Sequence, residues 1–453
     1  MNLTDTIAAT ATPIGEAGLA VIRISGADAL AVADRCFEPA GKQSAKPSTA
    51  DSHTIQYGHV VREGERIDEV LVAVMRAPRT FTAEDTVEIT CHGGMLSTRL
   101  VLETVLAAGA RMAEPGEFSK RAFLNGRIDL TQAEAVADLI HSRTELALGA
   151  ANEQLAGKLS RRIEEFREQM LKTLAHVEAH IDFPDEDIAP DTMEQLIGRL
   201  VDGVEFMDEL LRSAKEGKIL REGIRAAIVG RPNAGKSSLL NQLLGHDRAI
   251  VSTIAGTTRD TIEETANIRG IPVVFIDTAG LRETGDEIEQ EGIRRSHDAL
   301  EQAELILHVL DNHEELTEED RRYLDQYSDQ PRILVRNKMD LARRLELDED
   351  TRGVCSLSGD GIEALKDDIK SLVWSGEITA DNLQLMINAR HQNALLRAKE
   401  ATEKTIEALR MNLELELAAM DLRIAVNAVG EIVGKTSTED LLDQVFSQFC
   451  IGK

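Results

Sequence analysis

One octapeptide constrains the fold of this chain more than any other feature. Residues 230–237 have the sequence GRPNAGKS, of the form GxxxxGKS, and they stand between the apolar run IRAAIV and the helical pattern SLLNQLLG. In such a strand, loop and helix, glycines let backbone N–H groups surround phosphates, Lys236 supplies positive charge, and the Ser237 hydroxyl can ligate Mg2+. The sequence therefore predicts a P-loop domain, with a parallel sheet covered by helices.

Further motifs follow in a fixed order after this loop. The segment DTAG at 277–280 ends the apolar run IPVVFI, NKMD at 337–340 ends RILVR, and SLSG at 356–359 comes last. Asp277 can reach the Mg2+ site through its carboxylate, and the Gly280 N–H can contact a γ-phosphate. The Asp340 carboxylate can accept both N–H groups of a guanine edge, whereas adenine offers only one. The predicted nucleotide is therefore GTP.

The segment GTTRD at 256–260 is the predicted switch, in which Thr258 closes over Mg2+ when a γ-phosphate is present. Leu281 stands where Ras-like GTPases carry a glutamine that orients water, so another residue must position the nucleophile. The amide oxygen of Asn233 can coordinate a monovalent cation beside the phosphates. Such a cation would supply the charge that an arginine finger supplies elsewhere.

Composition limits the remaining possibilities. The 453 residues are enough for two to four domains, and the formal net charge of −28 disfavours a protein that grips nucleic acid through a basic surface. The four cysteines form no CxxC pair, which favours a reducing compartment. There is no signal-like start and no apolar run long enough to span a bilayer, so we expect a cytoplasmic protein without a membrane partner.

Changes in hydrophobic pattern divide the chain into three predicted domains. Residues 1–118 alternate β-like runs with turns, which predicts an α+β domain. Residues 119–217 and 380–453 carry apolar residues at helical spacing, and together they predict one helical bundle made from two separated stretches. Residues 218–379 form the α/β domain inserted between them.

Several local predictions accompany this division. We expect helices near 27–36 and 95–109, and a β-rich run at 354–359. His308 lies in the apolar run LILHVL and is expected to be a buried, hydrogen-bonded histidine. Trp374 is expected to pack at the end of the last helix of the α/β domain.

The motifs together resemble the MnmE (TrmE) family of tRNA-modification GTPases. The resemblance extends from ATPIGEAGLAVIRISG through PGEFSKRAFLNGRIDL, IDFPDED, GRPNAGKSS, IAGTTRD and DTAGLRE to the terminal FCIGK. It implies a tetrahydrofolate-binding-like N-terminal domain that dimerises, a discontinuous helical domain and an inserted Ras-like GTPase domain. It also implies an FAD-dependent MnmG-like partner in a heterotetramer, with tRNA bound through the complex. The implied reaction places a (carboxymethyl)aminomethyl group on C5 of the wobble uridine, using a folate-derived one-carbon unit.

The resemblance also assigns site residues. The K+ ligands would be Asn233, Ser252, Ile254 and Thr257, and the Mg2+ ligands Ser237 and Thr258. The candidate catalytic residues are Glu289, Lys236, Thr258 and Cys450. Without the resemblance, Glu289 would be taken as one of several exposed helix carboxylates. Formyl-tetrahydrofolate would lie near Arg23, Glu88, Arg127 and Lys453. GTP would contact Asn233, Ala234, Gly235, Lys236, Ser237, Ser238, Ser252, Thr253, Ile254, Ala255, Gly256, Thr257, Thr258, Asp277, Thr278, Ala279, Gly280, Asn337, Lys338, Asp340 and Ser358.

Two other classes of function fit part of the pattern. Ribosome-assembly GTPases of the Era and Der type share GRPNxGKS and a hydrophobic residue after DTAG. They also carry a KH-type RNA-binding module, and this sequence has no GxxG loop in a context that would indicate one. A non-enzymatic switch would only recruit partners according to its nucleotide state. Arg23, Glu88 and Arg127 argue against both, because neither needs a folate pocket.

Overall fold

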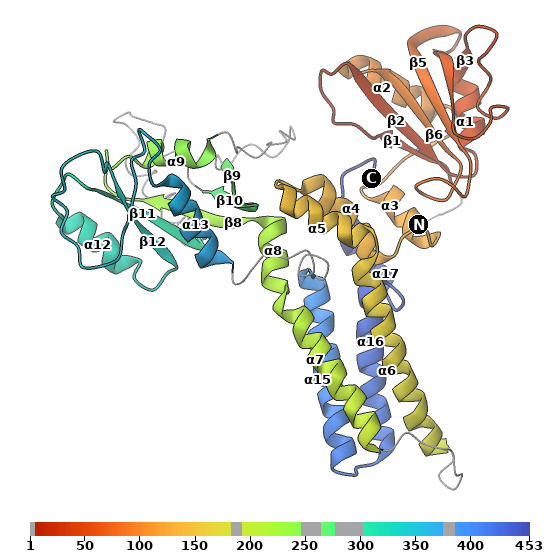
Figure 1. Ribbon diagram of the computed structural model, residues 1–453. Coiled ribbons are helices and arrows are strands. Elements are labelled where there is room, and N and C mark those ends of the chain that lie inside the picture. The colour runs from red at the N-terminus through yellow and green to blue at the C-terminus, as the bar shows by residue number, and fades with distance from the viewer. Residues whose placement is uncertain (1–4, 183–192, 246–263, 277–301, 375–385) are drawn as a thin grey trace. The chain divides into compact units, whose positions relative to one another are not determined.

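The computed structural model is shown in Figure 1. It describes residues 5–182, 193–245, 264–276, 302–374 and 386–453. The chain divides into two compact units, of which the first comprises Met1–Ala137, Ser160–Leu171 and Arg423–Lys453. The second comprises Asp138–Leu159 and Lys172–Leu422. Across the described ranges, no helix combines the length and the apolar character needed to cross a membrane.

The first unit contains a seven-stranded sheet in the order β3-β4-β5-β6-β2-β1-β7. All neighbours are antiparallel except β1 and β7. Helices α1 and α2 match the predicted helices to within two residues at each end. The bounds are β1 (Ile7–Thr10), β2 (Leu19–Ser25), α1 (Ala29–Cys36), β3 (Phe37–Pro39), β4 (Thr54–Arg62), β5 (Glu65–Met75), β6 (Thr86–His92), α2 (Met95–Ala107) and β7 (Arg111–Met112).

Strand β2 has one face in the core and one face available to a site. Ile22 and Ile24 are fully buried in the cluster that also contains residues of α1 and α2. Because successive side chains of a strand point to opposite faces, Arg23 lies on the other face of the sheet. The register places Arg23 directly opposite Glu88 of β6.

Helices from distant parts of the sequence pack together in the first unit. Helix α3 (Glu117–Leu124) meets α17 (Glu439–Phe446), where the rings of Phe123 and Phe446 lie 6.3 Å apart. Lys120 also forms a 2.5 Å ion pair with Asp443. Helices α4 (Leu130–His141), α6 (Lys158–Asp182) and α16 (Leu415–Val433) contribute residues to both units.

A buried cluster of charges joins the sheet of the first unit to α3. Arg121 is fully buried and donates to the Asp5 carboxylate at 2.6 Å and to Glu117 at 3.0 Å. Arg111 donates to the same two carboxylates, and its hydrogen bond lowers the pKa of Asp5. Removing one partner from such a cluster would leave a buried charge uncompensated, at a cost of about 3–5 kcal/mol.

In the second unit, helices from both sides of the α/β domain also pack together. Helix α7 (Met193–Arg212) packs against α15 (Ala389–Arg410), and Lys399 forms a 2.6 Å ion pair with Asp208. This packing agrees with a helical domain assembled from two separated stretches. Helices α5 (Glu145–Leu155) and α8 (Ala214–Glu222) complete the described helices of this part.

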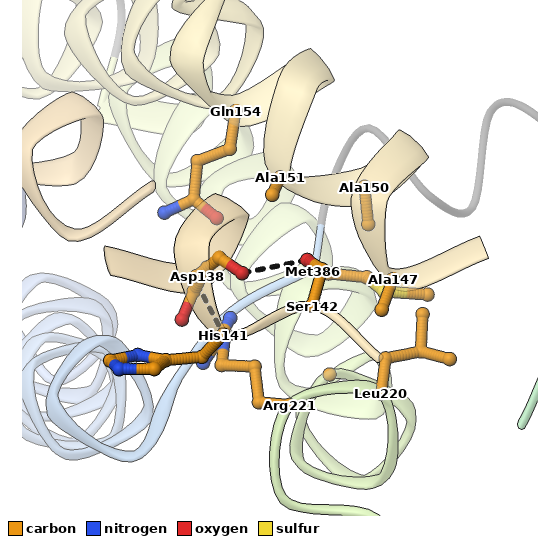
Figure 2. Close-up of a pocket in the computed structure, with 11 residues that line it drawn as sticks. Asp138, His141, Ser142, Ala147, Ala150, Ala151, Gln154, Leu220, Arg221 and Met386 are labelled. Carbon is orange, nitrogen blue, oxygen red and sulfur yellow. Dashed lines mark hydrogen bonds and ion pairs between the residues drawn. The ribbon is translucent and has the colours of Figure 1, made fainter. Parts of the chain in front are cut away.

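A small cavity lies where α4, α5 and α8 meet (Figure 2). Asp138 is held there by the Arg221 guanidinium at 2.8 Å, and the Ser142 hydroxyl donates to the Asp138 carbonyl at 2.6 Å. The cavity volume is about 30 Å³, and at roughly 10–15 Å³ for each water-sized probe this is room for about two waters. It is therefore a packing feature of this junction and not a substrate pocket.

The α/β part of the second unit has a six-stranded sheet in the order β13-β12-β11-β8-β10-β9. All pairs are parallel except β9 with β10. Helices α9 and α13 share one core with Trp374, as predicted for that residue, whereas α12 packs on the other face through Tyr323. The bounds are β8 (Ile224–Val229), α9 (Lys236–Leu244), β9 (Glu264–Ile268), β10 (Ile271–Phe275), β11 (Leu305–Asp311), α12 (Glu318–Gln326), β12 (Arg332–Asn337), β13 (Arg352–Gly353) and α13 (Ile362–Val373).

The prediction of a β-rich run at 354–359 is wrong. Strand β13 covers only Arg352–Gly353, and the chain then turns. The turn is closed by hydrogen bonds from the Gly359 N–H to the Cys355 carbonyl and from the Cys355 N–H to the Asp360 carbonyl, each 2.8 Å long. These backbone groups bond within the turn, so they cannot extend the sheet.

His308 is buried as predicted, but the prediction that it is hydrogen-bonded is not met among the described residues. Neither ring nitrogen has a hydrogen-bond partner among the described residues. The ring instead meets Tyr323 edge-on, with the centroids 6.0 Å apart. Burial lowers the pKa of His308 to about 4, because the surroundings do not solvate an imidazolium.

We predict that His308 makes this unit less stable in acid. The unfolded chain protonates this histidine near its ordinary pKa of about 6.5, whereas the folded chain does so only near 4, so stability is lost as the pH falls through this window. Between pH 7.5 and pH 5.0 the loss from this one group is about 2 kcal/mol. The test is urea unfolding followed by fluorescence of Trp374, the single tryptophan, which lies in the core of this unit. The His308→Phe variant should lose less stability than wild type over the same pH range, and equal losses would contradict the prediction.

Candidate functional site

The phosphate-binding motif occupies a special position in the sheet of the second unit. Strand β8 is central, with β10 on one side and β11 on the other. After β8 the chain builds β9 and β10 on one side and then returns to build β11 on the opposite side. The loop after Val229 therefore opens at the topological switch point, where ligands of α/β sheets bind.

Two glycines of this loop stand where no side chain fits. Gly230 has φ of 142°, and a Cβ there would collide with the Val309 carbonyl. Gly235 has φ of 93°, and a Cβ there would collide with the side-chain amide of Asn337. The loop backbone thus passes close to its neighbours, as a cradle for phosphates requires.

Lys236 begins α9, and its ammonium lies within the loop. Its Nζ donates to the carbonyls of Gly230 at 2.7 Å and Arg231 at 2.9 Å. Burial lowers the pKa of Lys236. Ser237 and Ser238 follow in the first turn of the helix, where backbone N–H groups lack helical partners. This part of the loop fits an anion such as a nucleotide phosphate.

Asn337 joins the phosphate loop to the later loops. Its Nδ2 donates to the Ala234 carbonyl at 2.9 Å. Its Oδ1 accepts from the Ser356 N–H at 3.1 Å and from the Ser356 hydroxyl at 2.9 Å. Three motifs that stand apart in the sequence therefore meet at one buried carboxamide.

The loop after β12 is fixed on both sides. Lys338 has φ of 63° and forms a 2.6 Å ion pair with Asp311. The thiol of Cys355 donates to Oδ1 of Asp340 at 3.2 Å. Sequence reasoning missed Cys355, although its place directly before the SLSG motif could have suggested it.

Ser358 is exposed at the end of these loops. Its hydroxyl donates to the Asp360 carboxylate at 2.6 Å. The structure thus brings together Asn233, Ala234, Gly235, Lys236, Ser237, Ser238, Asn337, Lys338, Asp340 and Ser358 around one end of the sheet.

The other residues predicted for GTP and the cations, together with Leu281 and Glu289 from the reasoning on the attacking water, lie outside the described residues. They are Ser252, Thr253, Ile254, Ala255, Gly256, Thr257, Thr258, Asp277, Thr278, Ala279, Gly280, Leu281 and Glu289.

A second group of predicted residues meets in the first unit. Arg23 of β2 and Glu88 of β6 form an ion pair, with Nε–Oε1 and Nη2–Oε1 distances of 2.9 and 2.8 Å. The Arg23 guanidinium carbon lies 5.9 Å from the ring centre of Phe81 and 5.7 Å from that of Phe118. The site thus offers a cation, a carboxylate and two aromatic rings on the sheet face that α1 and α2 leave uncovered.

The C-terminal residues complete this second group. Arg23 Nη1 donates to the Gly452 carbonyl at 3.4 Å, and the Phe118 N–H donates to the Lys453 carbonyl at 3.2 Å. Cys450 is exposed, and its carbonyl accepts from the Gly116 N–H at 3.4 Å. Arg127 is exposed in the turn after α3, and no hydrogen bond or ion pair between described residues joins its side chain to Arg23 or Glu88.

A phosphate loop at the switch point of a mostly parallel sheet, with the NKMD and SLSG loops fixed against it, defines a P-loop GTPase. Comparison with known families agrees and goes further. Residues 130–450 match the family model of the MnmE helical domain, and residues 6–127 match that of the GTP-binding protein TrmE N-terminus. The chain belongs to the MnmE family of tRNA modification GTPases.

Relatives match over almost the full length. The tRNA modification GTPase MnmE of Geobacillus kaustophilus is 48% identical over 461 residues, covering 99% of each chain. That of Listeria innocua is 47% identical over 458 residues, again covering 99% of each chain. Among solved structures, a crystal structure of Aquifex aeolicus Era is 26% identical, covers 39% of this chain and 66% of its own, and has a TM-score of 0.25.

The chain is therefore a GTP hydrolase that acts in tRNA modification, with GTP as substrate and Mg2+ as the expected metal. The family assignment favours this function over a ribosome-assembly GTPase or a non-enzymatic switch.

We predict that Gly235→Ala strongly weakens nucleotide binding without unfolding the protein. The new methyl group would meet the Asn337 amide, and the left-handed backbone at this position disfavours alanine. Displacing the loop should cost about 2–3 kcal/mol and weaken GDP binding roughly 100-fold. Binding of a fluorescent GDP analogue and the melting temperature are the two measurements. The control is Gly198→Ala on α7, where a methyl group meets nothing within 4 Å; weaker binding there, or normal binding by Gly235→Ala, would contradict the prediction.

Proposed function

We propose that this chain is a K+-dependent GTPase which, with an FAD-dependent MnmG-like partner, adds a (carboxymethyl)aminomethyl group to C5 of the wobble uridine of certain tRNAs. The one-carbon unit would come from a folate derivative. The observation that carries this proposal is the assembly of the phosphate loop and the base-reading loop around Asn337, in a chain of the MnmE family.

For the nucleotide, Asp340 would accept the two N–H groups of guanine, and Lys236 would hold the β and γ phosphates. The Cys355 thiol supports this assignment, because its hydrogen bond fixes one oxygen of the reading carboxylate. Ser237 and Thr258 would ligate Mg2+. The metal would neutralise charge that develops on the phosphate oxygens, as in other P-loop GTPases.

For hydrolysis, Asn233, Ser252, Ile254 and Thr257 would hold K+. The backbone of Asn233 supports a specific role, because it has φ of 63°, a conformation in which asparagine costs less strain than most residues. Glu289 would position the water indirectly, since Leu281 cannot.

For the folate, Arg23, Glu88, Arg127 and Lys453 would form the site. The Arg23–Glu88 pair is partly exposed and offers donors and an acceptor side by side, which suits the polar edge of a pterin-like ring. Phe81 and Phe118 could pack on the face of such a ring. Cys450 is exposed and stands two residues before Gly452, whose carbonyl accepts from Arg23, so a catalytic role is proposed for its thiol.

For partners, we propose a homodimer that joins the MnmG-like protein in a heterotetramer and meets tRNA through the complex. The net charge of −28 supports the proposal that the partner makes most of the tRNA contacts. Counterion release from tRNA needs lysines and arginines, and in this chain acidic residues outnumber them. A steep salt dependence of tRNA binding by this chain alone would overturn it.

We predict that GTP turnover is faster in KCl than in NaCl, on the order of 10- to 100-fold, because a bound K+ replaces a missing arginine finger. The measurement is steady-state phosphate release at equal ionic strength. Asn233→Ala should remove the difference between the two salts. Equal wild-type rates in KCl and NaCl would exclude the cation mechanism and leave the GTPase itself intact.

We also predict that Arg23→Met abolishes wobble-uridine modification and leaves GTP hydrolysis intact. In cells that lack the chain, wobble nucleosides would be analysed by mass spectrometry after complementation with wild type or Arg23→Met. The variant should hydrolyse GTP normally but fail to restore the modified uridine, because the folate site loses its cation. The matched control is Arg62→Met, which alters a partly exposed arginine at the end of β4 in the same sheet, with two strands between β4 and β2. Full restoration by Arg23→Met would refute the folate assignment.

A further inference from the structure

Arg231, the second residue of the phosphate loop, is tied to α12. Its Nε lies 2.9 Å from one oxygen of Asp320 and 3.0 Å from the other, and its Nη2 lies 2.6 Å from Glu314. The two carboxylates differ in environment: the Asp320 side chain is 4% exposed, whereas that of Glu314 is 56% exposed. The buried contact with Asp320 is therefore the one that water screens least.

Asp320 is itself held in place by the start of α12. It is the third residue of the helix, and its carboxylate accepts from the Thr317 N–H at 3.0 Å and from the Thr317 hydroxyl at 2.8 Å. Its own N–H donates back to the Thr317 hydroxyl, which completes a capping box. The carboxylate is thus anchored to the helix before it meets Arg231.

The contact with Arg231 leads directly to the phosphate-binding lysine. The carbonyl of Arg231 accepts from Nζ of Lys236 at 2.9 Å and from the Ala234 N–H at 3.4 Å. A residue whose side chain is clamped by a buried carboxylate has little freedom to turn its peptide group. Holding the Arg231 side chain therefore limits where the Lys236 ammonium can lie.

We propose that Asp320 is a positioning residue of the phosphate site. Through the guanidinium of Arg231 it fixes the carbonyl that holds Lys236, although it stands 89 residues from Arg231 in the sequence and contributes no group to the nucleotide. The proposal rests on the phosphate-binding role given above to Lys236. It adds α12, which the P-loop motif does not include, to the machinery that binds GTP.

The test uses the full-length chain, with binding of a fluorescent GDP analogue in the presence of Mg2+ as the readout. Asp320→Asn keeps an oxygen for the helix cap but removes the charge that holds Arg231, so affinity should fall about tenfold. Arg231→Met should have a similar effect. Both changes break the same ion pair, so their effects should not add. The affinity of the double variant for the GDP analogue should be within about twofold of that of the single variant that binds less tightly.

Two controls separate positioning from a general effect on the helix. Thr317→Ala removes the hydroxyl from the cap but keeps the backbone N–H of residue 317, which still holds the Asp320 carboxylate against Arg231. It should therefore lower the melting temperature while changing affinity less than twofold. Glu314→Gln removes only the exposed partner of Arg231 and should also change affinity less than twofold. Asp320→Glu, which restores the charge, should recover most of the binding.

Either of two results would overturn the proposal. If Thr317→Ala weakens binding as much as Asp320→Asn, the integrity of α12 matters and the ion pair does not. If the two single losses multiply in the double variant, Asp320 and Arg231 act independently. Failure of the wild type to bind the GDP analogue would instead refute the nucleotide site itself, and loss of K+ activation or of modified uridine would leave this proposal untouched.

Discussion

The carboxamide of Asn337 donates to the Ala234 carbonyl and accepts from both the N–H and the hydroxyl of Ser356, and the nucleotide site depends on this contact. The side chain is 2% exposed, so losing any of its partners would leave a polar group unsatisfied in the interior. It also fills the space that a side chain at position 235 would need. One buried group thus sets both the distance between two loops and the identity of a residue in one of them.

Periodicity and motif context predicted the frame in which this contact forms. Apolar runs before residues 230 and 337 become β8 and β12, and the two glycines of the phosphate loop stand where the predicted motif needs them. The prediction failed at 354–359, because the apolar start of this run resembles a strand. Its backbone hydrogen bonds instead close a turn. Burial of His308 was predictable from its apolar neighbours, but the lack of a hydrogen-bond partner was not, because that depends on which side chains surround the ring.

Contacts between distant residues were the least predictable part of the sites. Asp320 lies in the acidic stretch EELTEED, which by sequence resembles a solvated helix start. Only the fold shows that one carboxylate of this stretch is buried against the phosphate loop. The same holds for Phe81 and Phe118, whose rings flank Arg23, because aromatic residues in a sequence more often indicate core than a ligand face.

The acidic balance of the chain also shapes these contacts. Arginines in both units are engaged by carboxylates: Arg23 by Glu88, Arg121 by Asp5 and Glu117, Arg221 by Asp138 and Arg231 by Asp320. A guanidinium with its own carboxylate gains less from an external phosphate, because it must give up one partner for the other. These four guanidiniums are therefore less available to an external polyanion.

The hydrogen bond between Arg23 and Gly452 closes a loop of 429 residues. During synthesis, residues of β2 leave the ribosome hundreds of steps before the segment that carries Gly452, and domains fold as they emerge. The N-terminal sheet can therefore form early, but Arg23 can meet Gly452 only after the residues up to 452 have been made. A chain that stops before Gly452 would carry the sheet without this contact, so the surroundings of Arg23 are completed later than the sheet that holds it.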